Sequence, residues 1–389
     1  MSASQRRTYF DFNATTPLRP AVRDAMTAAL ALTGNPSSIH AEGRAARAAV
    51  EDARAAVAAL AGVAPGRVVF TSGATEGAAL ALSPALAGTN GAAEAERLVV
   101  GATEHPAVRL GHRFADERVE DARVTPDGLI DLDALRARLQ ARGRAVVAVQ
   151  LANGETGVVQ PIEAVAALVH ASDGLLVCDA SQAAGRIDLA PAARSADVLL
   201  LSAHKLGGPQ GAGAVVTLRD GLRFGPPLLR GGGQERGLRA GTENVAALAG
   251  FGAAARLAGD RADAGLLAGL RDRMEQRLLA AAPDLVVFGA AAPRLPNTSA
   301  FGAPGVDSQT ALIALDLAGF AVSTGSACSS GKVSRSAVLE AMGVDDHLRG
   351  SMIRVSLGWA TTAAEVESFV DAFAGLLQRM RGRAALRAA

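Results

Sequence analysis

Short, continuously apolar segments recur along the first half of the chain, and they constrain the fold more than any other feature. The six segments are 67–70, 98–100, 146–149, 175–178, 198–201 and 214–216. Unbroken apolarity, rather than alternation of apolar and polar residues, is typical of strands covered on both faces. Ala-rich stretches with helical spacing lie between them, at 43–61, 131–142 and 161–171, and Pro161 is expected in the first turn of the last one. This order of elements predicts an α/β fold with a mainly parallel sheet.

The texture of the sequence changes at about residue 244, where a pattern of Ala, Leu and Arg with helical spacing runs to about residue 281. We expect one long helix here that bridges two domains, because 389 residues exceed one ordinary core. Beyond this helix, apolar runs and helical patterns predict a smaller α+β domain. The runs lie at 286–288, around Phe301, at 320–322 and at 353–355, and the helical patterns at 307–318 and 362–380.

Charge and composition exclude several classes of protein. The chain has 39 basic and 38 acidic residues, a formal net charge of +1, and no basic stripe typical of nucleic-acid binding. Its only cysteines, Cys178 and Cys328, are too few for a disulfide framework and fit a reducing cytoplasm. Residues 1–12 lack the apolar core of a secretory signal, and no apolar run has membrane-spanning length. We therefore expect a cytoplasmic protein with small-molecule or protein partners, without direct nucleic-acid or membrane binding.

Polar residues with chemical potential follow the apolar run 198–201. Ser202, His204 and Lys205 come directly after it, and two glycines follow. Open α/β sheets bind ligands at the carboxyl ends of their strands, and glycines let the backbone approach a ligand closely. A lysine near apolar surface can bond to an aldehyde cofactor while hydroxyl and imidazole groups hold its phosphate. The alternative is an ordinary surface lysine beside a turn.

Two further segments supply what such a cofactor needs. Residues 72–76 lead from an apolar run into a predicted helix, where exposed N–H groups and the Thr75 hydroxyl can hold a phosphate. Asp179 ends the run 175–178, and Gln182 follows three positions later. A carboxylate in this place can keep a pyridine nitrogen protonated. Each segment has the alternative of capping the next helix, but together with Lys205 they favour a phosphate-bearing pyridine cofactor.

The two cysteines lie in opposite surroundings. Cys178 lies within an apolar segment and is expected to be a small core residue. Cys328 lies in the polar stretch 323–332, where almost no apolar side chain can shield the thiol. An exposed thiol on a flexible stretch is a liability unless its reactivity is used. We therefore interpret Cys328 as a nucleophile.

Ten segments, in the same order along the chain, resemble the cysteine desulfurases of aminotransferase class V. The resemblance is to the group with a long catalytic loop, which includes the desulfurases of iron–sulfur assembly. The ten segments are 11–17, 34–38, 72–76, 103–105, 179–182, 202–205, 231–235, 239–242, 323–328 and 353–358. They cover nearly the whole chain.

The resemblance implies a fold and an assembly. The fold is that of the type I transferases dependent on pyridoxal 5'-phosphate (PLP), in which a large domain has a mainly parallel seven-stranded sheet and a smaller domain is α+β. We place the large PLP-binding domain at 16–255, and the small domain at 1–15 and 256–389 with the catalytic loop at about 323–335. A homodimer is implied as well.

The resemblance also implies roles for individual residues. Lys205 would carry PLP, Asp179 would pair with its pyridine nitrogen, and His105 would stack on its ring and assist proton transfers. Arg354 and Asn153 would bind substrate, since the planar fork of an arginine suits a carboxylate. Gln182 would bond the PLP phenolic oxygen, and the remaining cofactor contacts would come from Ala74, Thr75, Ser202, His204 and, from the partner subunit, Thr242.

The implied reaction is a PLP-dependent sulfur transfer. L-Cysteine gives up its sulfur to Cys328 as a persulfide, and L-alanine is released. The loop carrying Cys328 must reach both the cofactor and an outside acceptor, so mobility is expected. The acceptor would be an iron–sulfur scaffold protein or an enzyme of thio-cofactor or tRNA thiolation.

Three places in the chain depart from the family pattern, and three alternative functions stay open. Gly154 stands where relatives carry the asparagine that contacts the PLP phenolic oxygen, so that hydrogen bond could come from Asn153 or from water, or be absent. Residues 77–79 and Trp359 also differ from the usual polar or basic residues. The alternatives are a selenocysteine lyase, a class V aminotransferase, against which Cys328 argues, and a catalytically impaired PLP-binding scaffold, against which Lys205 argues.

Overall fold

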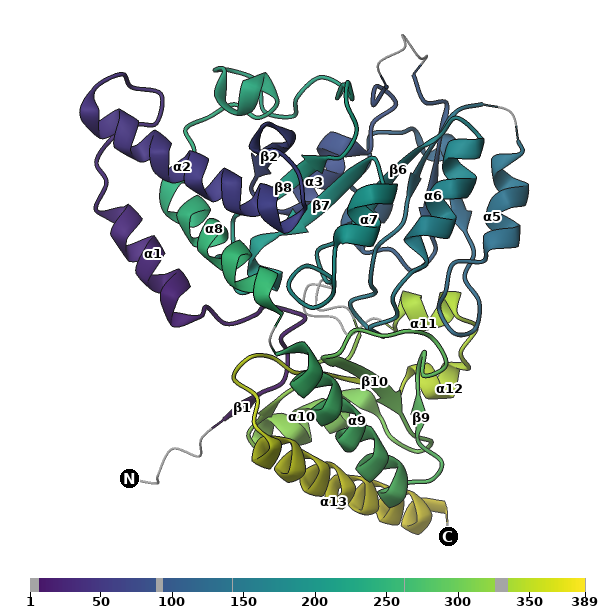
Figure 1. The fold of residues 1–389 in the computed structure, drawn as a ribbon. Coiled ribbons are helices and arrows are strands. Elements are labelled where there is room, and N and C mark those ends of the chain that lie inside the picture. The colour runs from purple at the N-terminus through teal and green to yellow at the C-terminus, as the bar shows by residue number, and fades with distance from the viewer. Residues whose placement is uncertain (1–6, 89–93, 142, 262, 326–334, 389) are drawn as a thin grey trace.

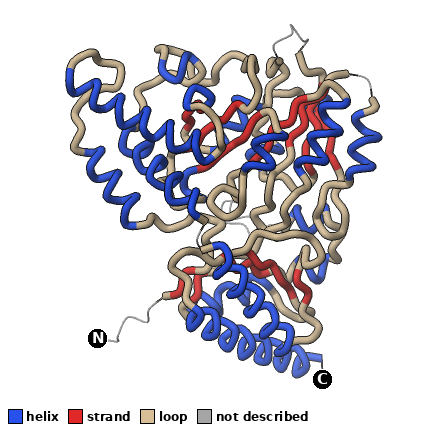
Figure 2. Tube along the Cα trace, viewed as in Figure 1, coloured by secondary structure: helices blue, strands red, loops and turns tan. Residues whose placement is uncertain are grey.

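The computed structural model describes residues 7–88, 94–141, 143–261, 263–325 and 335–388. A larger unit contains a seven-stranded sheet, and a smaller unit contains a three-stranded sheet and a two-stranded sheet. The smaller unit lies below the larger one in Figure 1, and both ends of the chain lie beside it. Figure 2 shows the strands inside each unit and helices on the outside.

The central sheet has the strand order β2-β8-β7-β6-β5-β3-β4. Its strands are β2 (Val68–Thr71), β3 (Arg97–Gly101), β4 (Val119–Ala122), β5 (Ala145–Ala148), β6 (Leu175–Asp179), β7 (Val198–Ser202) and β8 (Gly213–Thr217). Neighbours from β4 to β7 pair in parallel, while β8 runs antiparallel to both β7 and β2. The prediction of a mainly parallel α/β sheet is confirmed, and each of the six apolar segments contributes one strand.

Both faces of this sheet are buried, which explains the unbroken apolar runs. Successive residues of a strand point to opposite faces, and in β7 Leu199 and Leu201 enter one core while Val198 and Leu200 enter another. The first core is covered by α2 (Ala41–Leu60), α5 (Leu132–Leu139), α6 (Ile162–Ala171), α7 (Ala190–Ser195) and α8 (Val245–Asp260), and the second by α3 (Ala74–Ala81) and α4 (Pro106–Arg109). Helix α1 (Pro20–Leu30) packs on α8.

Strand β4 is the one strand of the sheet that no apolar run announces. It lies at the sheet edge and carries Glu120 and Asp121, of which Asp121 is exposed. An edge strand pairs on one side only and needs no apolar residues on both faces. Pro161 also differs from its expected place, because it stands just before α6 rather than inside the first turn.

The prediction of a single helix over 244–281 is wrong. Helix α8 ends at Asp260, Arg261 has a left-handed backbone with φ of 47°, and α9 begins at Ala264 and ends at Ala281. Helix α8 packs against α1 and α2 of the larger unit, whereas α9 packs against α13 (Ala363–Ala388) and β10 (Thr298–Gly302) of the smaller one. The two helices turn apart because they pack on different cores.

The smaller unit contains an antiparallel sheet in the order β12-β10-β9, with β9 at Val286–Val287 and β12 at Ile353–Ser356. Strand β11 (Phe320–Ala321) pairs instead with β1 (Thr8–Tyr9), in parallel. The remaining helices are α10 (Ser308–Leu317), α11 (Ala337–Ala341) and α12 (Asp346–Arg349). Edge-to-face ring contacts join Phe369 to Phe10 and Phe320, so the N-terminal segment is part of this core.

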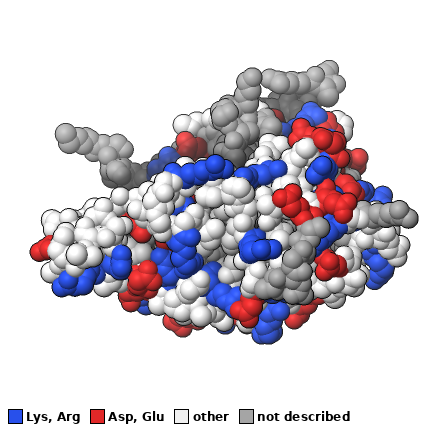
Figure 3. Space-filling model, turned by 90° about the horizontal axis from the view of Figure 1, so that it is seen from above, with Lys and Arg blue, Asp and Glu red and all other residues white. Residues whose placement is uncertain are grey.

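Four short 3-10 helices complete the described elements, at Pro65–Arg67, Asp116–Arg118, Ala203–Lys205 and Gln234–Gly237. None of the helices in the described ranges is both long and apolar enough to cross a membrane. Acidic and basic side chains are intermixed on the face that Figure 3 shows, with uncharged surface between them.

Candidate active site

Lys205 lies at the carboxyl end of the central sheet, where the 3-10 helix Ala203–Lys205 directly follows β7. Its Nζ donates hydrogen bonds to the carbonyl oxygens of Asn13, at 2.7 Å, and Ala14, at 3.0 Å. The Thr16 hydroxyl donates to the Lys205 carbonyl oxygen at 2.8 Å. The N-terminal segment, which is anchored in the smaller unit, therefore wraps around the lysine.

His204 is held by the same segment. Its Nδ1 lies 3.0 Å from the Thr15 hydroxyl, and its carbonyl oxygen accepts the Thr16 N–H. Burial, followed by the positive charges of Lys205 and Arg186, lowers the pKa of His204 to about 4. The imidazole is therefore neutral near pH 7, and an arriving phosphate dianion would favour its charged form.

Helix α3, which begins with Ala74 and Thr75, packs against β7, the strand that leads to Lys205. Gly73 precedes it without a side-chain cap, so the first N–H groups of the helix remain available to an anion. The Gly73 backbone packs closely on Gly213 of β8, where a Cβ would approach it to 2.6 Å. The structure thus fixes the position of this helix N-terminus.

Asp179 and His105 belong to the same group as Lys205. Asp179 ends β6, next to β7, and His105 begins the turn into α4. The pKa of His105 is lowered first by burial and then by the charge of Lys205, while Asp179 acts in the opposite direction. The Ala107 N–H donates to His105 Nδ1 at 3.1 Å, so in the neutral ring the proton belongs on Nε2.

Glu104, immediately before His105, is a buried carboxyl that the sequence analysis did not single out. It is 4% exposed; Oε1 accepts the Gln150 N–H, and Oε2 has no hydrogen-bond partner among the described residues. Burial and then the charge of Asp179 raise the pKa of Glu104 well above its ordinary value of 4.5. The folded protein consequently favours the protonated, neutral form.

We expect Glu104→Gln to remove a pH dependence of stability. Above pH 4.5 the folded state retains a proton on Glu104 that the unfolded chain releases, so the native protein loses stability as pH rises through this window. The slope is at most about 1.4 kcal/mol per pH unit. In urea unfolding from pH 5 to pH 8, the free energy of unfolding of the variant should increase relative to that of the native protein as pH rises. Parallel stability curves would contradict the assignment.

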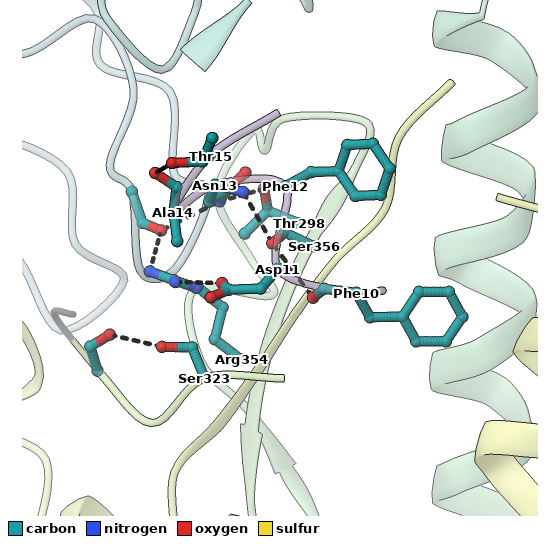
Figure 4. A network of polar contacts seen from close by, with 12 residues as sticks. Phe10, Asp11, Phe12, Asn13, Ala14, Thr15, Thr298, Ser323, Arg354 and Ser356 are labelled. Atoms are coloured by element: carbon teal, nitrogen blue, oxygen red, sulfur yellow. Dashed lines mark hydrogen bonds and ion pairs between the residues drawn. The ribbon is translucent and has the colours of Figure 1, made fainter. Parts of the chain in front are cut away.

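Arg354 lies on β12, across the N-terminal segment from Lys205. Figure 4 shows its guanidinium directed at Asp11, and Nη2 donates to Asp11 Oδ1 at 2.7 Å. Nη1 donates to the Gly154 carbonyl oxygen at 3.1 Å, while the buried Nε has no hydrogen-bond partner among the described residues. A buried, unpaired guanidinium N–H is a donor that a substrate carboxylate can satisfy.

Asn13 connects the two sides of the site, and its role was not predicted. It is 1% exposed, and its Nδ2 donates to the oxygens of Gly154, at 3.1 Å, and Thr298, at 2.9 Å. Its own N–H donates to the Ser356 hydroxyl, as Figure 4 shows. Since the Asn13 and Gly154 carbonyls also accept from Lys205 and Arg354, the amide ties the lysine to the arginine. The only sequence signal is a polar residue within the first matched segment.

Other predicted residues have different surroundings. Both ends of the Asn153 amide are engaged nearby: Oδ1 accepts the N–H groups of Glu155 and Thr156, and Nδ2 donates to the Thr103 carbonyl. Thr242 is exposed, and no hydrogen bond within the described residues joins it to the site, so its contact across a subunit interface stays a prediction. Cys178 is fully buried, as expected. Cys328 lies outside the described residues.

Residues 8–369 match the family model described as aminotransferase class-V, so the chain belongs to the class V aminotransferase family. Within that family it is a member of the cysteine desulfurases. It is 42% identical to a cysteine desulfurase of Cereibacter sphaeroides, over 96% of this chain and 97% of the relative. It is 37% identical to an IscS-like cysteine desulfurase of Mycobacterium tuberculosis, over 98% of each. The fold resembles the NifS-like protein of Rickettsia africae, with a TM-score of 0.84, 30% identity and coverage of 96% and 100%.

Proposed function

We propose that this chain is a cysteine desulfurase that carries PLP on Lys205 and converts L-cysteine to L-alanine, leaving the sulfur on Cys328. The observation that carries the proposal is the meeting of Lys205, Asp179 and His105 at one end of the sheet, with Arg354 joined to them through Asn13 and Gly154. The 42% identical relative supports the same activity.

The residues present fit PLP. The N-terminus of α3, with Thr75, and the neighbouring Ser202 and His204 would hold the phosphate, while Asp179 would hold the pyridine nitrogen. When bound, PLP supplies an electron-withdrawing ring that weakens the bonds around the substrate Cα. The chain supplies the rest: Lys205 gives a primary amine, and the neutral His105 can move a proton at Nε2.

Substrate orientation falls to Arg354. Its Nε has no hydrogen-bond partner among the described residues, and Asp11 holds Nη2, so the guanidinium would offer an N–H to the carboxylate of a bound cysteine. This grip aims the rest of the amino acid toward Lys205. The proposed role of Cys328 as the acceptor of the substrate sulfur rests on the sequence and the family, since that residue lies outside the described ranges.

We also propose a homodimer in the cytoplasm that passes sulfur to an acceptor protein, such as an iron–sulfur scaffold. Support for the dimer comes from apolar side chains on α1 and the segment after it, where Leu30 is 73% and Ile39 is 91% exposed. Apolar side chains this exposed are candidates for burial at a subunit interface. Sedimentation of Ile39→Asp beside the native protein tests this surface.

Replacing Cys328 by alanine is expected to reduce alanine formation from L-cysteine at least about 100-fold, because the sulfur loses its nucleophilic acceptor. The assay measures alanine and, with a reducing thiol present, sulfide. The matched control is Cys178→Ala, which removes the other, buried thiol and should retain the activity. Unchanged alanine formation by the Cys328 variant would refute its role.

A further inference from the structure

The important feature of Gly154 is the absence of a side chain at this position. Its φ lies outside the left-handed region, so other amino acids could adopt the same backbone conformation at this position. A Cβ at this position would lie 3.0 Å from Nε2 and 3.4 Å from Cδ of Gln182. The Gln182 side chain therefore occupies the space that a side chain at position 154 would need.

The Gln182 amide has one fixed orientation. Its Oε1 accepts a hydrogen bond from Arg186 Nη1, and its Nε2 donates to the Asn13 carbonyl oxygen at 3.0 Å. A flip would direct the NH2 group at the guanidinium, two donors against each other. Because Asn13 is the one acceptor that Nε2 has among the described residues, a second N–H remains for a ligand.

Arg186 is an unusual partner because it is a buried cation surrounded by neutral oxygens. It is 9% exposed and donates to the carbonyl oxygens of Gln182, Phe12 and Lys205 as well as to the Gln182 side chain. No carboxylate within the described residues pairs with it. Since water does not screen this charge, it polarises the Gln182 amide and makes the opposite N–H groups stronger donors.

The amide nitrogen of Gln182 and the amine of Lys205 share one acceptor. Both donate to the Asn13 carbonyl oxygen, at 3.0 and 2.7 Å. The Lys205 amine and the Gln182 amide therefore lie side by side, so a ligand bonded to Lys205 would lie beside this amide.

We propose that Gly154 and Arg186 are positioning residues for Gln182. The space above Gly154 admits the amide, and Arg186 fixes it with a polarised N–H directed at an oxygen of the ligand on Lys205. With no side chain at position 154, this N–H is the amide donor that meets that oxygen. This proposal rests on the proposed function for the identity of that ligand, PLP, but the contact between positions 154 and 182 belongs to the protein alone.

A double-mutant cycle tests the contact. Gly154→Ala should lower the Tm of the purified holoenzyme by about 2–4 °C, the size expected for a methyl group forced into a filled space. In a Gln182→Ala background the same change should have almost no effect, because the competing side chain is gone. The control is Gly66→Ala, where a Cβ would meet nothing within 4 Å. Equal Tm losses in both backgrounds would overturn the proposal.

A spectroscopic titration tests the positioning role. An N–H donated to the phenolic oxygen of bound PLP withdraws electron density, so its loss should raise the pH midpoint of the visible absorption band. We expect upward shifts in Gly154→Ala and Gln182→Ala that do not add in the double variant. Arg186→Met should shift the midpoint in the same direction, and Arg186→Lys less. Unchanged midpoints in all four single variants would overturn this role.

A protein without any visible band would instead refute the proposed function, and the Tm cycle would still decide whether positions 154 and 182 are in contact.

Discussion

Lys205→Ala is expected to reduce alanine formation from L-cysteine by about 100-fold or more, within the range that loss of an acid–base group alone produces. The amine lies between two carbonyl oxygens, beside Asp179 and His105, and no other described residue places a primary amine there. Lys205→Arg should be equally inactive. An arginine retains the charge and can donate to Asn13, but it stays protonated and cannot bond to an aldehyde.

The composition of the chain makes this test unusually direct. Lys205 and Lys332 are the only lysines in the sequence, and every other basic side chain apart from histidine is an arginine. Borohydride reduction of the purified protein should therefore fix the cofactor to a single peptide, the one containing Lys205, and Lys205→Ala should show none. Substantial activity in both lysine variants, or a label on Lys332, would contradict the assignment.

Three of the residues that the sequence predicted at the site, Asp179, Ser202 and Lys205, lie at or just after the end of an apolar strand. Asp179 and Lys205 follow unbroken strand segments, and the carboxyl ends of parallel strands meet at one edge of the sheet. Asn13 and Arg186 were not assigned roles. Their importance arises from contacts with Ser356 and Phe12, which are distant in sequence, and nothing in their own surroundings announces such contacts.

The fold follows the same division. Strands buried on both faces were predictable because burial alone determines their composition. The break between α8 and α9 was not predictable, because both helices are rich in Ala and Leu and they diverge only where each packs on its own core. Strand β4 could not be predicted from its own residues, because it forms by pairing with β3.

Breaking the ion pair between Arg54 and Glu235 is expected to have the largest effect on stability. Arg54 on α2 donates from Nη1 and Nη2 to the two carboxylate oxygens of Glu235, each at 2.7 Å, and the side chains are 7% and 2% exposed. The guanidinium also lies over the Phe70 ring at 4.7 Å. The other carboxylate that pairs with Arg54, Glu51, has a side chain that is 55% exposed, so removing Glu235 leaves the buried charge poorly compensated, which costs about 3–5 kcal/mol.

Glu235→Gln therefore tests the pair with little change in shape. Urea unfolding should show a loss of about 3–5 kcal/mol, and the double variant Arg54→Met/Glu235→Gln, which leaves no buried charge, should lose less than Glu235→Gln alone. Equal losses of stability in the single and double variants would contradict the cost assigned to the unpaired buried charge.

The effect should extend to the cofactor. Glu235 also accepts the Phe70 N–H at 2.8 Å, and both Glu235 and Arg236 have left-handed backbones, with φ of 46° and 57°. Such conformations persist only where surrounding contacts hold them, so loss of the pair should relax this loop. Phe70 lies on β2, four residues before α3, and Arg239 of the same loop pairs with Glu76 in the first turn of α3. We accordingly expect Glu235→Gln to weaken PLP binding, measured by equilibrium dialysis, as well as stability.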